Sequence, residues 1–274
     1  MQCTGFAKRA TKISAAILLA AFALSPASQA QTPAPAPICK AQLDEVLRLA
    51  NPLTRVGRKL VSGEPIVIVA IGSSSTWGAG ASSQAGSYPA KLEIELRAHF
   101  PKQSITVINR GVGGEEVADM LKRFDTAIVE AKPDMVLWQL GTNSILRDHK
   151  ISAADASIRE GIRMIRSVNA DIVLIDPQFA PKVIAKPDAE RMVELIATTA
   201  KQEDVDLFRR FDVMKRWSVV DRLSFDAFVS PDGVHMNDWS YACLAKGLGV
   251  AIAEAATRPV MSATAAPGAS RPTK

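Results

Sequence analysis

"PIVIVAIGSSSTWG", residues 65–78, joins an apolar run to a loop that contains three consecutive serines. The apolar run is rich in β-branched residues and has no polar side, which is typical of a strand buried on both faces of a parallel sheet. The loop would then leave the carboxyl end of that strand, where parallel α/β sheets bind their ligands. The stretch therefore raises the question of whether Ser73, Ser74 or Ser75 is a nucleophile.

Four further apolar runs of this kind follow, and segments with helical periodicity separate them. Such alternation predicts an α/β protein, a three-layer α/β/α sandwich whose right-handed connections build a mostly parallel five-stranded sheet. The runs are "SITVIN" (104–109), "DMVLWQLG" (134–141), "DIVLID" (171–176) and the weaker "VDLF" (205–208).

The helical segments are recognised by apolar residues three and four positions apart. We expect one helix from Val117 to Ile128, a second that Ser152 caps, and a third around Met192 to Ala200. A last helix, capped by Asn237, should end before Pro259.

The chain begins with the features of a secretory signal. Basic residues precede an apolar run at 13–24, and "SQA" (28–30) has the form of a cleavage site, so we expect residues 1–30 to be removed. The run is shorter than the roughly 20 residues that cross a bilayer, which argues against a membrane anchor. A Pro/Ala linker (31–37), one domain (38–257) and a flexible tail (258–274) complete the predicted organisation.

Charge and cysteine content fit an exported protein. Removal of Lys8, Arg9 and Lys12 with the signal would lower the formal net charge from +5 to +2, so the composition gives no reason to expect a nucleic-acid partner. Cys39 and Cys243 remain near the two ends of the mature chain. They could be two buried thiols or a disulfide, and the sequence leaves both open.

Several common sites are excluded by their motifs. Loop 72–78 lacks the Gly-Lys-Ser/Thr of a phosphate-binding loop and the Gly-x-Ser-x-Gly of a nucleophile elbow. "GVGGEE" (111–116) carries Glu116 where a dinucleotide fingerprint needs a small residue. The three histidines form no pair with metal-ligand spacing, so we expect no metal and no organic cofactor.

The candidate general base is His235, in "SPDGVHMND". Asp232 lies three residues before it, and such a turn lets a carboxylate approach Nδ1 while Nε2 stays free to accept a proton. "PDG" is also an ordinary turn, so the pair alone is weak evidence. His99 is interpreted as a surface or helix-terminal residue and His149 as a solvated one.

Four short blocks together resemble the SGNH hydrolases, also called the GDSL esterase/lipase family. They are "GSSSTWG" (72–78), "NRGVGG" (109–114), "GTN" (141–143) and "DGVH" (232–235), which occur in the family's order and positions relative to strands. The resemblance spans essentially the whole core and implies the flavodoxin-like fold of that family.

The resemblance also implies roles for individual residues. Ser74 matches the nucleophile, and His235 with Asp232 would complete the catalytic triad. The oxyanion hole would comprise Ser74, Gly114 and Asn143. Two positions depart from the family pattern, since Ser73 and Ser144 stand where aspartate is usual.

The resemblance implies an exported serine esterase, periplasmic or secreted, that hydrolyses carboxylic esters through an acyl-enzyme. A small-molecule or carbohydrate ester is the expected substrate, with a short acyl group on a carbohydrate or cell-envelope substrate favoured. Alternatives are an acyltransferase to a sugar hydroxyl, a lipase or thioesterase, and a non-catalytic periplasmic binding protein. Trp77 and "LSFDAFV" (223–229) could line the substrate pocket or belong to the core.

Overall fold

A computed structural model describes residues 1–2, 37–41 and 44–259 of the chain. Nearly all of the predicted signal, linker and tail lie outside these residues. No helix in the described part of the chain combines the length and the apolar character that a membrane-crossing segment requires.

Five parallel strands form one sheet in the part of the chain that the structure describes, in the order β2-β1-β3-β4-β5. The sequence prediction of a five-stranded α/β sheet is confirmed. β1 and β3 are almost completely buried because helices cover both faces of the sheet, which explains their continuous apolar sequences. The strands are β1 (Ile66–Gly72), β2 (Ile105–Gly111), β3 (Met135–Gln139), β4 (Asp171–Ile175) and β5 (Asp206–Phe208).

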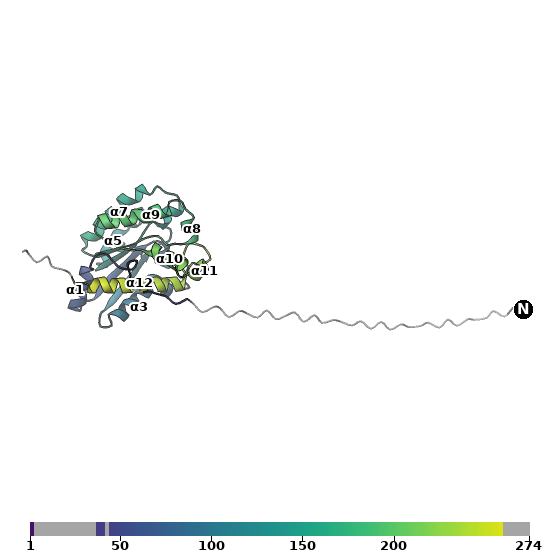
Figure 1. Cartoon of the computed structure of the whole chain (residues 1–274), viewed down its shortest axis with the longest axis horizontal. Helices are drawn as coiled ribbons and strands as arrows, with labels where there is room; N and C mark the ends of the chain where they lie inside the picture. Colours follow the sequence, from purple (N-terminus) through teal and green to yellow (C-terminus); the bar gives the residue numbers. More distant parts are fainter. Residues whose placement is uncertain (3–36, 42–43, 260–274) are drawn as a thin grey trace, which may run out of the picture. The chain divides into compact units, whose positions relative to one another are not determined.

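Helices pack in a layer on each face of the sheet. Figure 1 shows α3 and α12 along one face and α7 and α9 along the other. The helices are α1 (Thr54–Ser62), α2 (Ser74–Trp77), α3 (Tyr88–His99), α4 (Val117–Lys122), α5 (Phe124–Ala127), α6 (Thr142–Leu146), α7 (Ser152–Ser167), α8 (Pro181–Ile184), α9 (Ala189–Gln202), α10 (Arg210–Val219), α11 (Phe225–Phe228) and α12 (Asp238–Thr257), with 3₁₀ turns η1 (Gln84–Gly86) and η2 (Val129–Ala131).

Two helix predictions were wrong in detail. The predicted helix from Val117 to Ile128 is divided into α4 and α5, because the backbone of Arg123 leaves the helical region at φ −117° and ψ 17°. Ser152 does not cap α7. Ile151 already has helical angles, so Ser152 is the first residue inside the helix. The predicted cap of α12 is confirmed, since the Asn237 side chain accepts the N–H of Ser240.

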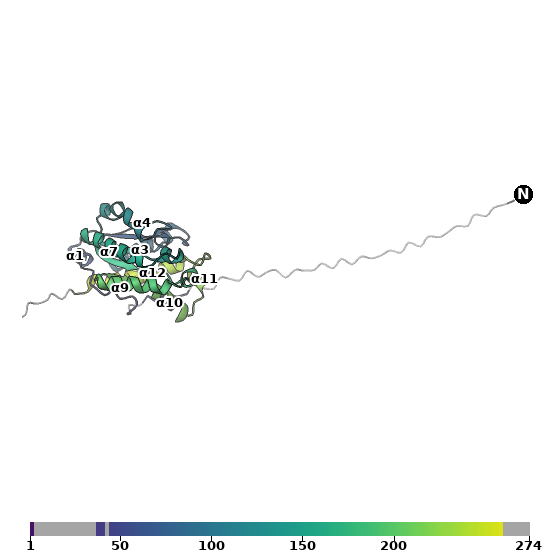
Figure 2. The same ribbon diagram turned by 90° about the horizontal axis from the view of Figure 1, so that it is seen from above.

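The sheet has two functionally different ends. α1 lies at the amino ends of the strands, where its N-terminal N–H groups donate to Asp171 and its Arg55 pairs with Asp134 at 2.8 Å. α10 and α11 lie toward the opposite end in both views (Figures 1 and 2), and α8 lies at that end in Figure 1. β1 pairs with both β2 and β3, so the chain connections diverge from β1 to its two sides. In α/β sheets, ligands bind at the carboxyl end of the strands at such a point.

Cys39 and Cys243 form a disulfide. Their Cα atoms lie 5.5 Å apart, and 204 positions separate them in sequence. The bond attaches residues 37–41 to α12, and the Trp239 indole N–H donates to the Pro37 carbonyl nearby at 2.6 Å. Of the two alternatives that the sequence left open, the structure therefore has the disulfide.

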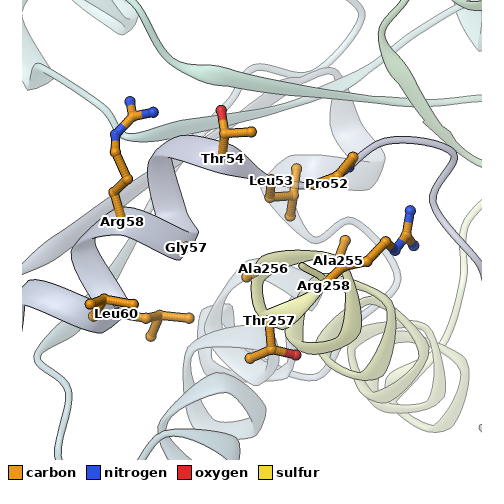
Figure 3. A pocket seen from close by; sticks show the side chains of 11 residues that line it. Pro52, Leu53, Thr54, Gly57, Arg58, Leu60, Ala255, Ala256, Thr257 and Arg258 are labelled. Carbon is orange, nitrogen blue, oxygen red and sulfur yellow. The ribbon is translucent and has the colours of Figure 1, made fainter. Parts of the chain in front are cut away.

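A cavity of about 480 Å³ lies between α1 and the C-terminal end of α12 (Figure 3). Its walls include Leu53 and Leu60 from the α1 region and Ala255 and Ala256 from α12. The backbones approach closely here, since a Cβ atom built at Gly57 would lie 2.6 Å from the Ala256 carbonyl oxygen. This cavity is at the amino end of the sheet and is thus remote from the loops that carry the candidate residues.

Candidate active site

The candidate residues predicted from the sequence all lie at the carboxyl end of the sheet. Ser74 begins α2 directly after β1, Gly114 is in the loop after β2, and Asn143 is in α6 after β3. Asp232 and His235 occupy the loop between α11 and α12. The topology therefore gathers residues that are far apart in the sequence.

Ser74, His235 and Asp232 form one hydrogen-bonded row. His235 Nε2 lies 2.7 Å from Ser74 Oγ, and His235 Nδ1 lies 2.5 Å from Asp232 Oδ2. Because an ionised carboxylate only accepts hydrogen bonds, Nδ1 carries the proton, and Nε2 of a neutral ring is then the acceptor for the serine hydroxyl. The row can move a proton from Ser74 to His235.

The Asp232 carboxylate is held by its own turn. Its Oδ1 accepts the N–H groups of Val234 and His235, at 2.8 and 2.9 Å, and the Ser230 hydroxyl at 2.9 Å. Partial burial would raise the pKa of Asp232, but the hydrogen bonds from His235, Val234 and Ser230 outweigh it and hold the pKa of this carboxyl well below its usual range. Asp232 is therefore ionised at neutral pH.

Burial distinguishes the three serines of the loop. The side chains of Ser73 and Ser75 point into the protein, and these residues are only 2% and 1% exposed. Ser74 is partly exposed and is the one that contacts His235. Of the three hydroxyls, only that of Ser74 is both accessible and paired with a base.

Gly114 and Asn143 are held together by their neighbours. Gly114 has a φ of 81°, a left-handed conformation that favours glycine. Its carbonyl accepts the Arg147 guanidinium at 2.8 Å, and the Asn143 side-chain amide donates to the Glu115 carbonyl at 2.8 Å. The second N–H of this amide has no acceptor among the described residues.

Ser144, one of the two departures from the family pattern, contacts a carboxylate from another loop. Its hydroxyl donates to Glu116 at 2.8 Å, and the same carboxylate binds Arg147 at 2.7 Å and His149 at 3.0 Å. Burial would raise the pKa of Glu116, but hydrogen bonds from Arg147, His149 and Ser144 lower it. The sequence interpretation of His149 as merely solvated missed this contact, which joins α6 to the loop of Gly114.

Ser73, the other departure, is paired with Gln139, a residue that the sequence analysis missed. Gln139 Oε1 accepts the N–H of Ser73 at 2.9 Å and its hydroxyl at 3.0 Å. It also accepts the Thr76 hydroxyl at 3.3 Å. The signal available in the sequence was that Gln139 is a polar residue within the apolar run "MVLWQL" (135–140). In the structure Gln139 is 1% exposed.

Gln178 is a second missed residue, and it joins two of the candidate blocks. It is completely buried, its Oε1 accepts the Thr142 hydroxyl at 2.8 Å, and its Nε2 donates to the Val234 carbonyl at 3.1 Å. Thr142 precedes Asn143 and Val234 precedes His235. One side chain thus connects α6 to the histidine loop.

Within residues 37–41 and 44–259, no group of three or more His, Cys, Asp or Glu side chains is arranged to hold a metal ion. The chemistry that the described arrangement supports is proton transfer from the Ser74 hydroxyl to His235.

Comparison with known proteins identifies relatives of the chain. The model of the Non-GDSL lipase-like family matches residues 39–258. An arylesterase of Vibrio mimicus is 26% identical over 46% of this chain and 61% of its own length. An acetylxylan esterase of Geobacillus stearothermophilus is 28% identical over 39% of this chain and 43% of its own length. The chain thus matches less than two thirds of either curated relative.

The fold is also found among solved structures. A two-domain esterase active on acetylated mannans has a TM-score of 0.67 and 18% identity, with 85% of this chain and 62% of that chain covered. At this identity the likeness concerns the fold, which is that of the SGNH hydrolases.

Proposed function

Since the chain belongs to the Non-GDSL lipase-like family, we propose that it is a serine esterase that hydrolyses short acyl esters on carbohydrates. The observation that carries this proposal is the row formed by Ser74, His235 and Asp232, at 2.7 and 2.5 Å. The names of the relatives, an acetylxylan esterase and an esterase active on acetylated mannans, support the carbohydrate class.

The reaction starts at Ser74. Its Oγ attacks the ester carbonyl carbon while the hydroxyl proton passes to His235 Nε2, and Asp232 stabilises the imidazolium that forms. The imidazolium then donates its proton to the oxygen of the departing alcohol, which leaves an acyl group on Ser74. Water attacks this acyl-enzyme, His235 accepts the proton of the water, and the free acid is released as Ser74 regains its proton.

The carbonyl oxygen carries negative charge in both tetrahedral intermediates. We assign its stabilisation to the N–H groups of Ser74 and Gly114 and to the Asn143 amide. Fixed donors stabilise such charge without the reorganisation that water requires, and one donor typically contributes about 10²- to 10³-fold in rate.

Labelling with a fluorophosphonate, followed by mass spectrometry, tests the proposal. We expect one adduct, on Ser74, and hydrolysis of p-nitrophenyl acetate by the wild type. Ser74→Ala should lose both, with a fall in rate of at least about 10³-fold. Ser75→Ala is the matched control and should keep both. Labelling at another residue, or full activity of the Ser74→Ala variant, would contradict the assignment.

We further propose that the protein acts in the periplasm or outside the cell, because residues 1–30 have the composition of a signal peptide. N-terminal sequencing of the protein from separated cell fractions tests this. A mature chain that begins at Gln31 is the expected result, and an intact Met1 in the cytoplasmic fraction would contradict it.

A further inference from the structure

Trp77 is an exposed aromatic residue beside the candidate nucleophile. Its side chain is 50% exposed, and it is the only aromatic residue among the exposed large hydrophobic residues of the described chain. The other tryptophans are more covered, with Trp138 and Trp217 at 0% and 4% exposure. Because it is exposed and lies three residues after Ser74, Trp77 is a candidate contact for a substrate bound at Ser74.

The short helix α2 orients Trp77 and Ser74 toward the same side. Residues three apart in a helix share a face, and Trp77 follows Ser74 by three. The two residues between them, Ser75 and Thr76, point inward and are 1% and 0% exposed. The indole and the nucleophilic hydroxyl therefore emerge from the outer side of one helical turn.

The backbone of Trp77 is firmly held although its side chain is exposed. The N–H of Trp77 donates to the Ser73 carbonyl at 3.0 Å, and the Asn109 side chain donates to the Thr76 carbonyl at 2.8 Å. A Cβ atom built at Gly111 would overlap the backbone nitrogen of Trp77, so β2 and α2 are in close contact. The indole is thus displayed from a rigid base.

The segment that follows β2, next to α2, is exposed. Val112, which follows Gly111, is 43% exposed, and its N–H donates to the Gly72 carbonyl at 3.0 Å at the end of β1. A Cβ atom built at Gly113 would meet nothing within 4 Å. Gly113 is followed by Gly114, whose N–H we assign to the oxyanion hole.

We infer that Trp77 forms the face on which a pyranose ring stacks while an ester on that ring reaches Ser74. A sugar ring presents a flat row of C–H groups, which matches the flat, rigid and open face of an indole. A long acyl chain would instead need an enclosed wall on several sides. The inference rests on the proposed function and names the alcohol side of the substrate.

Binding to the inactivated enzyme tests the inference separately from hydrolysis. Calorimetry would measure the dissociation constant of partially acetylated xylotetraose for Ser74→Ala protein, alone and combined with Trp77→Ala, Trp77→Phe or Ile94→Ala. Ile94 is the control because it is an exposed hydrophobic residue on α3, at 61%. We expect Trp77→Ala to weaken binding about tenfold, Trp77→Phe to retain most of the affinity, and Ile94→Ala to have no effect.

The outcomes separate this inference from the proposed function. Equal affinity with and without Trp77, or no saturable binding by the Ser74→Ala protein, would overturn the sugar-stacking role even if the wild type hydrolyses p-nitrophenyl acetate. A Trp77→Ala variant that changes only the preference between p-nitrophenyl acetate and hexanoate would overturn it too, by placing the indole on the acyl side. If the wild type showed no esterase activity but the Ser74→Ala protein bound the oligosaccharide in a Trp77-dependent way, sugar stacking on Trp77 would be supported and the proposed esterase function would be refuted.

Discussion

Gln139 Oε1 accepts both the N–H and the hydroxyl of Ser73, at 2.9 and 3.0 Å. The residue before the candidate nucleophile is therefore positioned by a neutral amide from the adjacent strand β3. With an aspartate at position 73, a carboxylate would face this amide oxygen. The serine at position 73 and the glutamine at position 139 thus form a matched pair.

We predict that Gln139→Leu lowers both stability and activity. Leucine has a similar size, but it leaves the buried N–H of Ser73 without its acceptor, which costs about 1–3 kcal/mol of unfolding free energy. We also expect kcat to fall because Ser74 follows Ser73 directly. Urea denaturation and p-nitrophenyl acetate kinetics measure the two effects. Gln84→Leu, at an exposed position, is the control. Wild-type stability and kcat in Gln139→Leu would show that this contact is dispensable.

Asn143→Ala should reduce kcat by about 10²- to 10³-fold, because it removes one proposed oxyanion donor. The side chain makes one described hydrogen bond, to the Glu115 carbonyl, so a smaller effect on the melting temperature is expected. Steady-state kinetics with thermal unfolding separates the two effects. If kcat is retained, Asn143 serves only to connect α6 to the Glu115 loop.

Asp232→Asn should lower kcat by about 100-fold or more, because the imidazolium of His235 loses its charged partner. The same substitution should also change how the free energy of unfolding depends on pH. The lowered pKa of Asp232 means that the carboxylate contributes stability above the unfolded pKa of about 4, and this contribution is lost as the pH falls below that value. Urea denaturation at pH 3 and pH 7 should therefore show a smaller acid destabilisation in the variant. If both proteins lost the same unfolding free energy between pH 7 and pH 3, the role of the hydrogen bonds around Asp232 would be contradicted.

Asp176 predicts the opposite pH dependence. Burial raises its pKa to about 7, although the N–H of Phe211 and the charge of Arg210 partly offset this. Ionising a carboxyl whose pKa is raised by folding costs stability, so the wild type should lose stability between about pH 4 and pH 7, by up to about 4 kcal/mol. Asp176→Asn should remove that decline and keep the hydrogen bond from Phe211, which lies 2.9 Å from Oδ1. Urea denaturation between pH 4 and pH 8 measures it, and parallel curves for the two proteins would contradict the raised pKa.

The strands and the gathering of the candidate residues could be predicted from the sequence. Runs that are apolar on both faces require burial in a parallel sheet, and the carboxyl ends of such strands meet at one edge. The order of burial among Ser73, Ser74 and Ser75 could not be predicted from local sequence, because α2 alone decides which side of the turn faces the core. The resemblance to a family selected Ser74, and the structure adds that Ser74 is the partly exposed serine of the three and the one that contacts His235.

The features that could not be predicted from the sequence depend on contacts between segments that are distant in sequence. Arg123 interrupts the predicted helix, and its guanidinium binds Glu115 at 2.8 Å and the Arg110 carbonyl at 2.9 Å. Gln139 and Gln178 are unusual in their apolar surroundings, but their partners lie 66 and 36 positions away in sequence. Periodicity reports which side of an element is buried, and it carries no information on such pairings.

The junction of α1 with the end of α12 bears on how the protein could be used. Thr257 and Arg258 border the cavity at the amino end of the sheet (Figure 3). Ser74 follows the carboxyl end of β1, at the opposite end of the sheet. A fusion partner or a solid support joined to the chain after Arg258 would thus leave from the side away from the nucleophile. Immobilisation through this end of the domain should keep the face with Ser74 and Trp77 open to a substrate as large as a polymer.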